Sequence, residues 1–167
     1  MIIRTALLIT CLSFIYHHTA LGQKTSDEKD VVRVIEQLFT GMEKGDSTLV
    51  KNCFAGNVTI ATLHRDKENN PLLRRESSIR GFLKAIGTPH PDAWYEEVWN
   101  IKVQIDDDLA QVWCDYAFYL GNKFSHCGVD AFQLSKTKEG WRIFHLADTR
   151  RSSNCTIPKK IQRKHGL

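Results

Sequence analysis

The run from Trp94 to Arg150 alternates between apolar and polar residues almost without a break, and it limits the possible folds more than any other feature. Only short turns interrupt it, at Asp107-Asp108, Gly121-Asn122 and Lys138-Glu139-Gly140. Alternation with a period of two places successive side chains on opposite faces of a strand, and short polar turns join antiparallel neighbours. The run therefore predicts a four-stranded antiparallel meander.

The preceding residues predict helices first. Between Asp27 and Lys44 apolar residues recur at intervals of three and four, which predicts a helix that Ser26 or Asp27 caps and Gly45 ends. Its apolar face comprises Val31, Val32, Ile35, Leu38, Phe39 and Met42.

Four shorter elements follow this helix. We expect a helix at residues 47–54 with Asp46 as its N-cap, strands at 57–64 and 71–75 joined by a turn at 69–71, and a helix at 77–86. Helices first and a long meander last predict an α+β domain, with N-terminal helices packed on a strongly bent antiparallel sheet.

The first 22 residues resemble a signal peptide, with a positive start, an apolar stretch from Thr5 to Tyr16, and Ala20 and Gly22 three residues and one residue before a cut. We expect the mature chain to begin at Gln23 and to be exported, either to the periplasm or out of the cell. An uncleaved anchor is the alternative, but His17 and His18 interrupt the apolar stretch, so we expect no stable membrane insertion.

The order of elements resembles the nuclear transport factor 2-like (NTF2-like, cystatin-like) cone, also called SnoaL-like. Three segments, 124–134, 140–143 and 146–151, are similar to the secreted bacterial group labelled as lumazine-binding. The resemblance covers Asp27 to Cys155 and implies this fold and export. It also implies a cavity on the concave face of the sheet and a subunit contact on the outer face.

Counting residues outward from two-residue hairpin turns assigns the side chains of the meander to two faces. One face is almost wholly apolar. The other mixes aromatic and ionisable groups, as a ligand pocket does, and we predict that it lines the cavity. Its members include Asn100, Lys102, Trp113, Asp115, Ala117, Tyr119, His126, Gly128, Asp130, Phe132 and Leu134.

The count places His126 opposite Ala117, next to Asp115, with Asp130 on the same face. A carboxylate beside an imidazole raises its basicity, so these three residues are candidate catalytic groups. A structural hydrogen-bonded cluster, or a lining that only orients a ligand, is the alternative. The predicted ligand-binding residues are Asn100, Trp113, Tyr119 and Phe132.

Four cysteines follow the signal peptide, at positions 53, 114, 127 and 155, and they allow three complete pairings. Because the last hairpin brings the start of one strand near the end of the next, Cys127 and Cys155 are the candidate disulfide. Residues 23–155 would then form the domain, and residues 156–167 a basic C-terminal tail.

No cysteine pair or histidine has zinc-ligand spacing, and no motif for a nucleotide, a dinucleotide or a serine nucleophile occurs. We therefore expect no metal and no cofactor. A net charge of +4 with dispersed basic residues gives little support for nucleic-acid binding. Because both sheet faces are too apolar to remain in water, we expect a homodimer.

Two functions follow from these features. The first is an exported domain that binds a small, aromatic or heterocyclic molecule without catalysis. The second is a cofactor-free SnoaL-like lyase, isomerase or cyclase in which His126, with Asp115 or Asp130, moves a proton. A structural dimer module with a vestigial cavity is a third reading. The sequence identifies no ligand.

Overall fold

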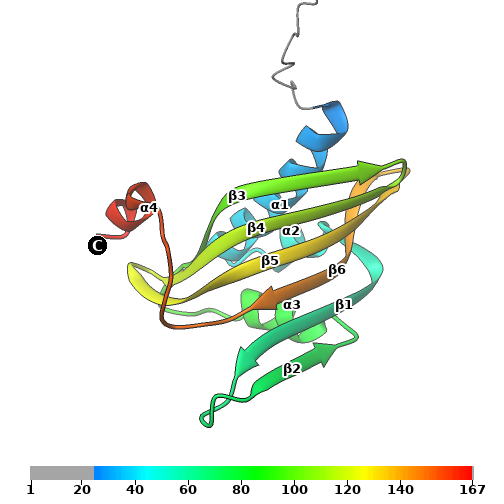
Figure 1. Cartoon of the computed structure of the whole chain (residues 1–167). Coiled ribbons are helices and arrows are strands. Elements are labelled where there is room, and N and C mark those ends of the chain that lie inside the picture. The colour runs from blue at the N-terminus through cyan, green and yellow to red at the C-terminus, as the bar shows by residue number, and fades with distance from the viewer. Residues whose placement is uncertain (1–24, 167) are drawn as a thin grey trace, which may run out of the picture.

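The protein is described by a computed structural model that covers residues 25–166 (Figure 1). The expected signal peptide lies outside the described residues. The helices are α1 (Ser26–Lys44), α2 (Ser47–Lys51), α3 (Arg80–Gly87) and α4 (Lys159–Lys164). The strands are β1 (Phe54–Arg65), β2 (Pro71–Glu76), β3 (Trp94–Asp106), β4 (Leu109–Leu120), β5 (Lys123–Thr137) and β6 (Gly140–Thr149).

Helix α1 confirms the first predicted helix, but it begins one residue earlier, after Thr25. Thr25 accepts a hydrogen bond from the backbone N–H of Glu28, and the Glu28 carboxylate accepts one from the N–H of Thr25. This reciprocal pair is a capping box, and it replaces the expected cap at Ser26 or Asp27. Gly45 ends the helix with φ of 65°, a left-handed conformation that glycine adopts without strain.

The other helices are shorter than predicted or lie at different positions. Helix α2 ends at Lys51 because Phe54 already begins β1, although its predicted cap, Asp46, does accept bonds from Thr48 and Leu49. Helix α3 begins at Arg80, three residues later than expected.

Strands β3 to β6 confirm the meander and its three turns. They pair antiparallel in sequence order, and each turn lies where predicted. The register shifts three times, between Trp99 and Lys102 on β3, between Phe118 and Tyr119 opposite β5, and in the β5–β6 pair. Such bulges change which face the following side chains occupy.

The complete sheet has the strand order β2-β1-β6-β5-β4-β3. It is mixed, because β1 pairs parallel with β6, with Ile60 beside Leu146 and Thr62 beside Asp148. Strand β2 then pairs antiparallel with β1 at the edge. The predicted antiparallel sheet therefore gains one parallel pair.

Helices α1, α2 and α3 cover one face of the sheet, here called the inner face, and the opposite, outer face carries α4 at one end (Figure 1). The core lies between α1 to α3 and the inner face, with Ile35, Leu38, Val112, Phe132 and Ile143 all at most 1% exposed. In residues 25–166 no helix is long and apolar enough to cross a membrane.

The residues expected to form a basic tail contain α4, which packs on the outer face. His165 is 3% exposed and stacks on Tyr119, with ring centroids 3.9 Å apart. Its Nε2 lies 3.0 Å from the carboxylate of Glu97, which also pairs with Lys164. The segment leading to α4 is fixed by a disulfide between Cys127 and Cys155, which confirms the predicted pair.

Candidate functional site

A cavity of about 820 Å³ lies between the inner face and helices α1 and α3. Its size falls within the range of small-molecule sites. The apolar part of the wall consists of Met42, Ile60, Phe82, Ala85, Trp94 and Phe118. The polar part consists of Thr62, His64, Arg74, Glu76, Glu96, His126, Arg150, Arg151 and Ser152. An apolar wall with one polar side can both enclose a ligand and orient it.

The strand register explains why ionisable groups gather here. On the inner face Phe118 lies between Glu96 of β3 and His126 of β5. Asp130 of β5 lies beside Asp148 of β6, which lies beside Thr62 of β1. Strands β1, β6, β5 and β3 therefore direct polar side chains to one region of an otherwise apolar face.

Asp148 is 6% exposed, and both of its carboxylate oxygens have partners. Thr62 Oγ1 donates to one oxygen at 2.7 Å, and Arg150 Nε donates to the other at 2.6 Å. Burial alone would lower the pKa of Arg150, but the bond to Asp148 and its charge raise that pKa on balance. Asp148 therefore holds Arg150 in its charged form at the edge of the cavity.

Tyr116 lies beneath this ion pair. It is 1% exposed, and its hydroxyl donates to the backbone oxygen of Thr149 at 2.9 Å. Gly128 faces Tyr116 on β5, and a Cβ there would lie 1.7 Å from the oxygen of Thr149. Only glycine leaves room for this close approach of backbone segments.

Asp130 and Glu96 form a pair of carboxyl groups in hydrogen-bonding contact. Asp130 is 2% exposed, and its Oδ2 is buried without a hydrogen-bond partner. Two carboxyl groups can share a hydrogen bond only when one of them carries a proton. The pair therefore holds a proton beside the cavity, whose wall includes Glu96.

Burial and the closeness of the two carboxyl groups shift the pKa of both. Burial raises the pKa of Glu96 to about 7, with the charge of Asp148 adding to the shift. Burial also raises the pKa of Asp130 well above its ordinary value, and the neighbouring Glu96 carboxylate raises it further. The pair consequently retains a proton near neutral pH.

His126 is half-buried in the cavity wall. Its Nδ1 lies 3.0 Å from Ser125 Oγ, and its ring packs on Phe118 with centroids 5.0 Å apart. Burial and the nearby charge of Arg150 lower the pKa of His126 to about 4. The predicted increase in basicity is therefore wrong, and the imidazole is neutral near pH 7.

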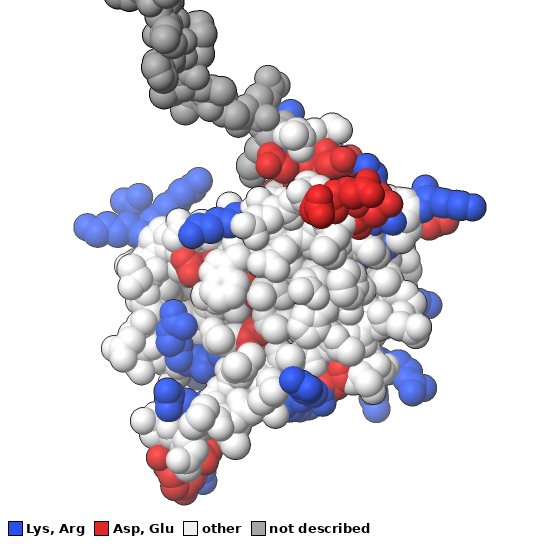
Figure 2. Space-filling model, turned by 45° about the vertical axis from the view of Figure 1, so that its right-hand side comes forward, with Lys and Arg blue, Asp and Glu red and all other residues white. Residues whose placement is uncertain are grey.

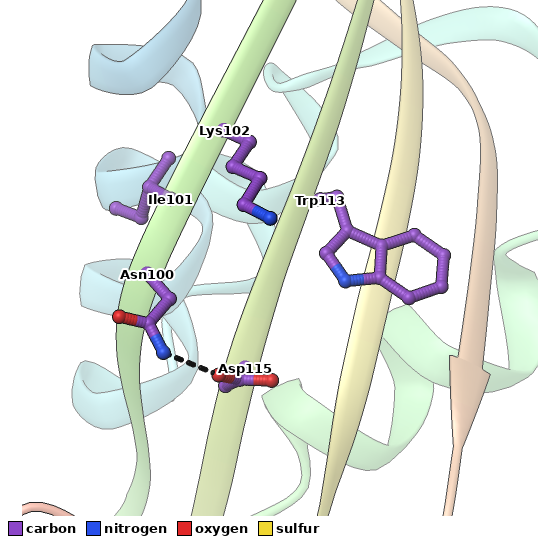
Figure 3. Close-up of a pocket in the computed structure, with 5 residues that line it drawn as sticks. All are labelled: Asn100, Ile101, Lys102, Trp113 and Asp115. Carbon is purple, nitrogen blue, oxygen red and sulfur yellow. Dashed lines mark hydrogen bonds between the residues drawn. The ribbon is translucent and has the colours of Figure 1, made fainter.

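The predicted site residues separate onto the two faces. His126, Asp130 and Phe132 lie on the inner face, where Phe132 is 0% exposed and packs edge-on against Phe39 in the core. Asn100, Trp113 and Asp115 lie on the outer face (Figure 3). Tyr119 is buried beneath His165 of the α4 segment.

One bulge explains this separation. The turn pairs Leu120 with Lys123 and Tyr119 with Phe124 as expected, but Phe118 then pairs with His126, so that Ser125 is the extra residue. His126 is therefore opposite Phe118, not Ala117, and the predicted contact with Asp115 is wrong. From that point β5 side chains share a face with the other set of β4 side chains.

Sequence reasoning missed Glu96, the bond between Thr62 and Asp148, and the position of His64 in the cavity wall. Glu96 had a detectable signal, since it shares a strand face with Trp94 and Val98, where a third apolar residue would be expected. His64 carries a buried Nδ1 without a partner. Within residues 25–166 no group of three or more histidine, cysteine or acidic residues is arranged to hold a metal ion.

Comparison with known proteins supports the fold. Neither the family models nor the curated proteins gave a match to the sequence. An NTF2-like protein of unknown function from Shewanella baltica superposes with a TM-score of 0.57 at 21% identity, over 78% of this chain and all of the other. A cystatin-like, NTF2-like protein from Novosphingobium aromaticivorans gives 0.60 at 11% identity, over 84% and 89% of the two chains.

The fold is NTF2-like. The predicted α+β cone is thereby confirmed, whereas neither of these structures is named for lumazine or for export. A further NTF2-like structure, from Streptomyces avermitilis, belongs to a proposed dehydratase and gives a TM-score of 0.57 at 15% identity, over 75% and 96% of the two chains. Structural similarity at this level of identity shows the NTF2-like fold and does not assign an activity.

Proposed function

We propose that this chain is an exported domain that binds a small molecule in the inner cavity. The observation that carries the proposal is a hollow of about 820 Å³ with aromatic walls and one polar side. Trp94, Phe82 and Phe118 would contact the apolar body of the ligand. Arg150 and the Glu96–Asp130 pair would bind its polar groups.

Export is supported by the signal-like first 22 residues and by the disulfide between Cys127 and Cys155. Disulfides persist in the periplasm and outside the cell, and they are rare in the reducing cytoplasm. The periplasm or the extracellular space is therefore the proposed location.

Native mass spectrometry of the full chain, purified from its own host, tests binding directly. A retained small molecule is expected, and Ala85→Leu should retain less of it because the larger side chain projects from α3 into the space that the ligand would occupy. Lys84→Ala, which alters an exposed neighbour on the same helix, should retain it. Equal retention by Ala85→Leu and the unaltered chain would place the ligand elsewhere.

A second candidate is a cofactor-free lyase, isomerase or cyclase. The observation that favours it is the proton shared by Glu96 and Asp130, next to a neutral His126 across Phe118. The carboxyl pair could donate a proton while His126 accepts one. Asp115 has no part in this version, since it lies on the outer face.

The two candidates differ in how they respond to removal of the proton-transferring groups. His126→Gln and Glu96→Gln keep the cavity size and leave side chains that still donate and accept hydrogen bonds, so retention of the bound molecule should change little if the protein only binds. Under the catalytic reading, each variant should abolish conversion of the retained molecule, whereas Glu43→Gln on the exposed side of α1 should not.

A further inference from the structure

Trp113 presents an aromatic surface on the outer face, on the opposite side of the sheet from the inner cavity. It is 47% exposed. Figure 3 shows its indole lying over β5, where its register partner is Ala131. Because alanine carries only a methyl group, the ring can rest close to the sheet and turn a flat face to solvent.

Hydrogen-bonding side chains flank this ring on one side. Gln104, Gln111 and Gln133 are register partners on β3, β4 and β5 and form a row next to Trp113. Within residues 25–166, no hydrogen bond occupies their side-chain amides. A hollow of about 340 Å³ lies between Lys102, Gln104, Gln111 and Trp113.

The other side of the ring carries a second polar group. Asn100 Nδ2 donates to Asp115 Oδ2 at 2.7 Å, and both residues line a hollow of about 480 Å³ beside Trp113 (Figure 3). Asn100 has a φ of 52° and lies in the bulge between Trp99 and Lys102. The bulge therefore directs the amide toward Asp115 and fixes a donor and an acceptor next to the indole.

These groups together suit a neutral, polyhydroxylated ligand. An exposed ring attracts the C–H face of a sugar, while amides and carboxylates bind its hydroxyl groups through paired donors and acceptors. One lysine and one aspartate line the two hollows, so their formal charges cancel. Figure 2, an oblique view of this side, shows few charged side chains near its centre.

We propose that the surface around Trp113 binds a β-linked, gluco-configured glycan, with one pyranose ring stacked on the indole. In that configuration the ring hydroxyls are equatorial, and both ring faces expose only C–H groups. The glutamine row would bind hydroxyls on one side, and the Asn100–Asp115 pair those on the other. This site does not depend on the function proposed for the inner cavity.

A second copy of the chain is the competing occupant. Helix α4 and His165 already cover Tyr119 at one end of the outer face. Pairing two copies over Trp113 would bury Lys102, Asp115 and three unbonded glutamines, whereas the centres of subunit interfaces are depleted of charged residues. The polar surroundings of the indole therefore favour a hydrated sugar.

Isothermal titration calorimetry of the full chain with cellohexaose and with N-acetylchitohexaose tests the proposal. At least one probe should bind at millimolar concentration. Trp113→Ala should weaken binding by at least about 10-fold, and Trp113→Tyr by only a few-fold, because tyrosine retains a stacking surface. Leu73→Ala, which truncates another exposed apolar residue, should leave affinity unchanged.

Three results would overturn the proposal. They are the absence of binding by both probes, unchanged binding by Trp113→Ala, and a wild-type dimer in sedimentation experiments that Trp113→Ala converts to a monomer. The last result would assign this surface to a subunit contact. Because Trp113 is exposed, its variants should fold, and circular dichroism checks that they do.

Discussion

Glu96 and Asp130 bring two carboxyl groups into hydrogen-bonding contact, although they belong to β3 and β5 and β4 lies between those strands. The contact requires a proton, and Glu96 lies in the same cavity wall as His126, whose imidazole is neutral near pH 7. Near pH 7 one wall of the cavity thus holds a carboxyl group that keeps its proton and an imidazole that is unprotonated. These opposite shifts make opposite contributions to the stability of the protein.

Glu96→Gln should change how stability depends on pH. The pKa of Glu96 is about 7 in the folded protein against an ordinary value of 4.5. The folded state keeps a proton that the unfolded chain releases, so this group lowers the free energy of unfolding as pH rises from 4.5 to 7. In urea unfolding between pH 4.5 and 7, the free energy of unfolding should fall less in the variant than in the wild type. In Glu43→Gln, it should depend on pH as it does in the wild type.

His126→Gln should have the opposite effect. The pKa of His126 is about 4 against an ordinary value of 6.5. Below pH 6.5 the unfolded chain binds a proton that the folded protein does not, so the free energy of unfolding decreases as pH falls toward 4. The variant should lose less stability on acidification than the wild type in the same urea experiment. A larger loss would show that His126 is charged in the fold.

Asp148→Asn should destabilise the protein by about 1–3 kcal/mol, because asparagine has no charge and one acceptor oxygen in place of two, so it cannot accept from both Thr62 and Arg150. Asp30→Asn is the matched control. Asp30 also pairs with an arginine at 2.6 Å, but that pair is on the surface, so its loss should cost less than about 1 kcal/mol. If thermal unfolding showed similar losses of stability for the two variants, the bonds of Asp148 with Thr62 and Arg150 would not be important for stability.

Tyr119→Phe and Tyr116→Phe should change the free energy of unfolding differently, although both remove a hydroxyl from a buried tyrosine of β4. The Tyr119 hydroxyl is buried without a partner, so its removal should be neutral or stabilising. The Tyr116 hydroxyl donates to the oxygen of Thr149, so its removal should cost about 1 kcal/mol. Equal losses in chemical denaturation would mean that Tyr119 is also hydrogen-bonded.

Replacement of both Cys127 and Cys155 by alanine should lower the free energy of unfolding by about 3–4 kcal/mol, the loop-closure value for cysteines 28 residues apart. The segment from Arg151 to α4 should also become more sensitive to trypsin. Cleavage at Lys159 or Lys160 monitors this by mass spectrometry. An unchanged cleavage rate would show that the contacts of His165 alone hold α4.

The elements of this fold could be predicted because local patterns determine them. The spacing from Val31 to Met42 predicted α1, and Gly45 predicted its end. The three polar turns predicted where β3 to β6 begin and end. The parallel pairing of β1 with β6 could not be predicted, since it depends on contacts between residues more than 80 positions apart.

The site was only partly predictable, because one extra residue decides which face a side chain occupies. His126 and Asp130 reach the inner face, but Ser125 shifts them away from Asp115 and Trp113, with which simple alternation had grouped them. The proton shared by Glu96 and Asp130 arises from a contact across an intervening strand, and it leaves no local signature in the sequence.

The parallel pair of β1 and β6 also affects how the chain folds during synthesis, which bears on the proposed export. In the sheet β1 lies between β2 and β6. Before residues 140–149 leave the ribosome, the β1–β2 hairpin is therefore not joined to strands β3 to β5. The β1–β2 hairpin acquires its second neighbour only after residues 140–149 have been translated. A nascent chain therefore stays incompletely folded until β6 has been made, and an incompletely folded chain is what the proposed export through a translocation channel would require.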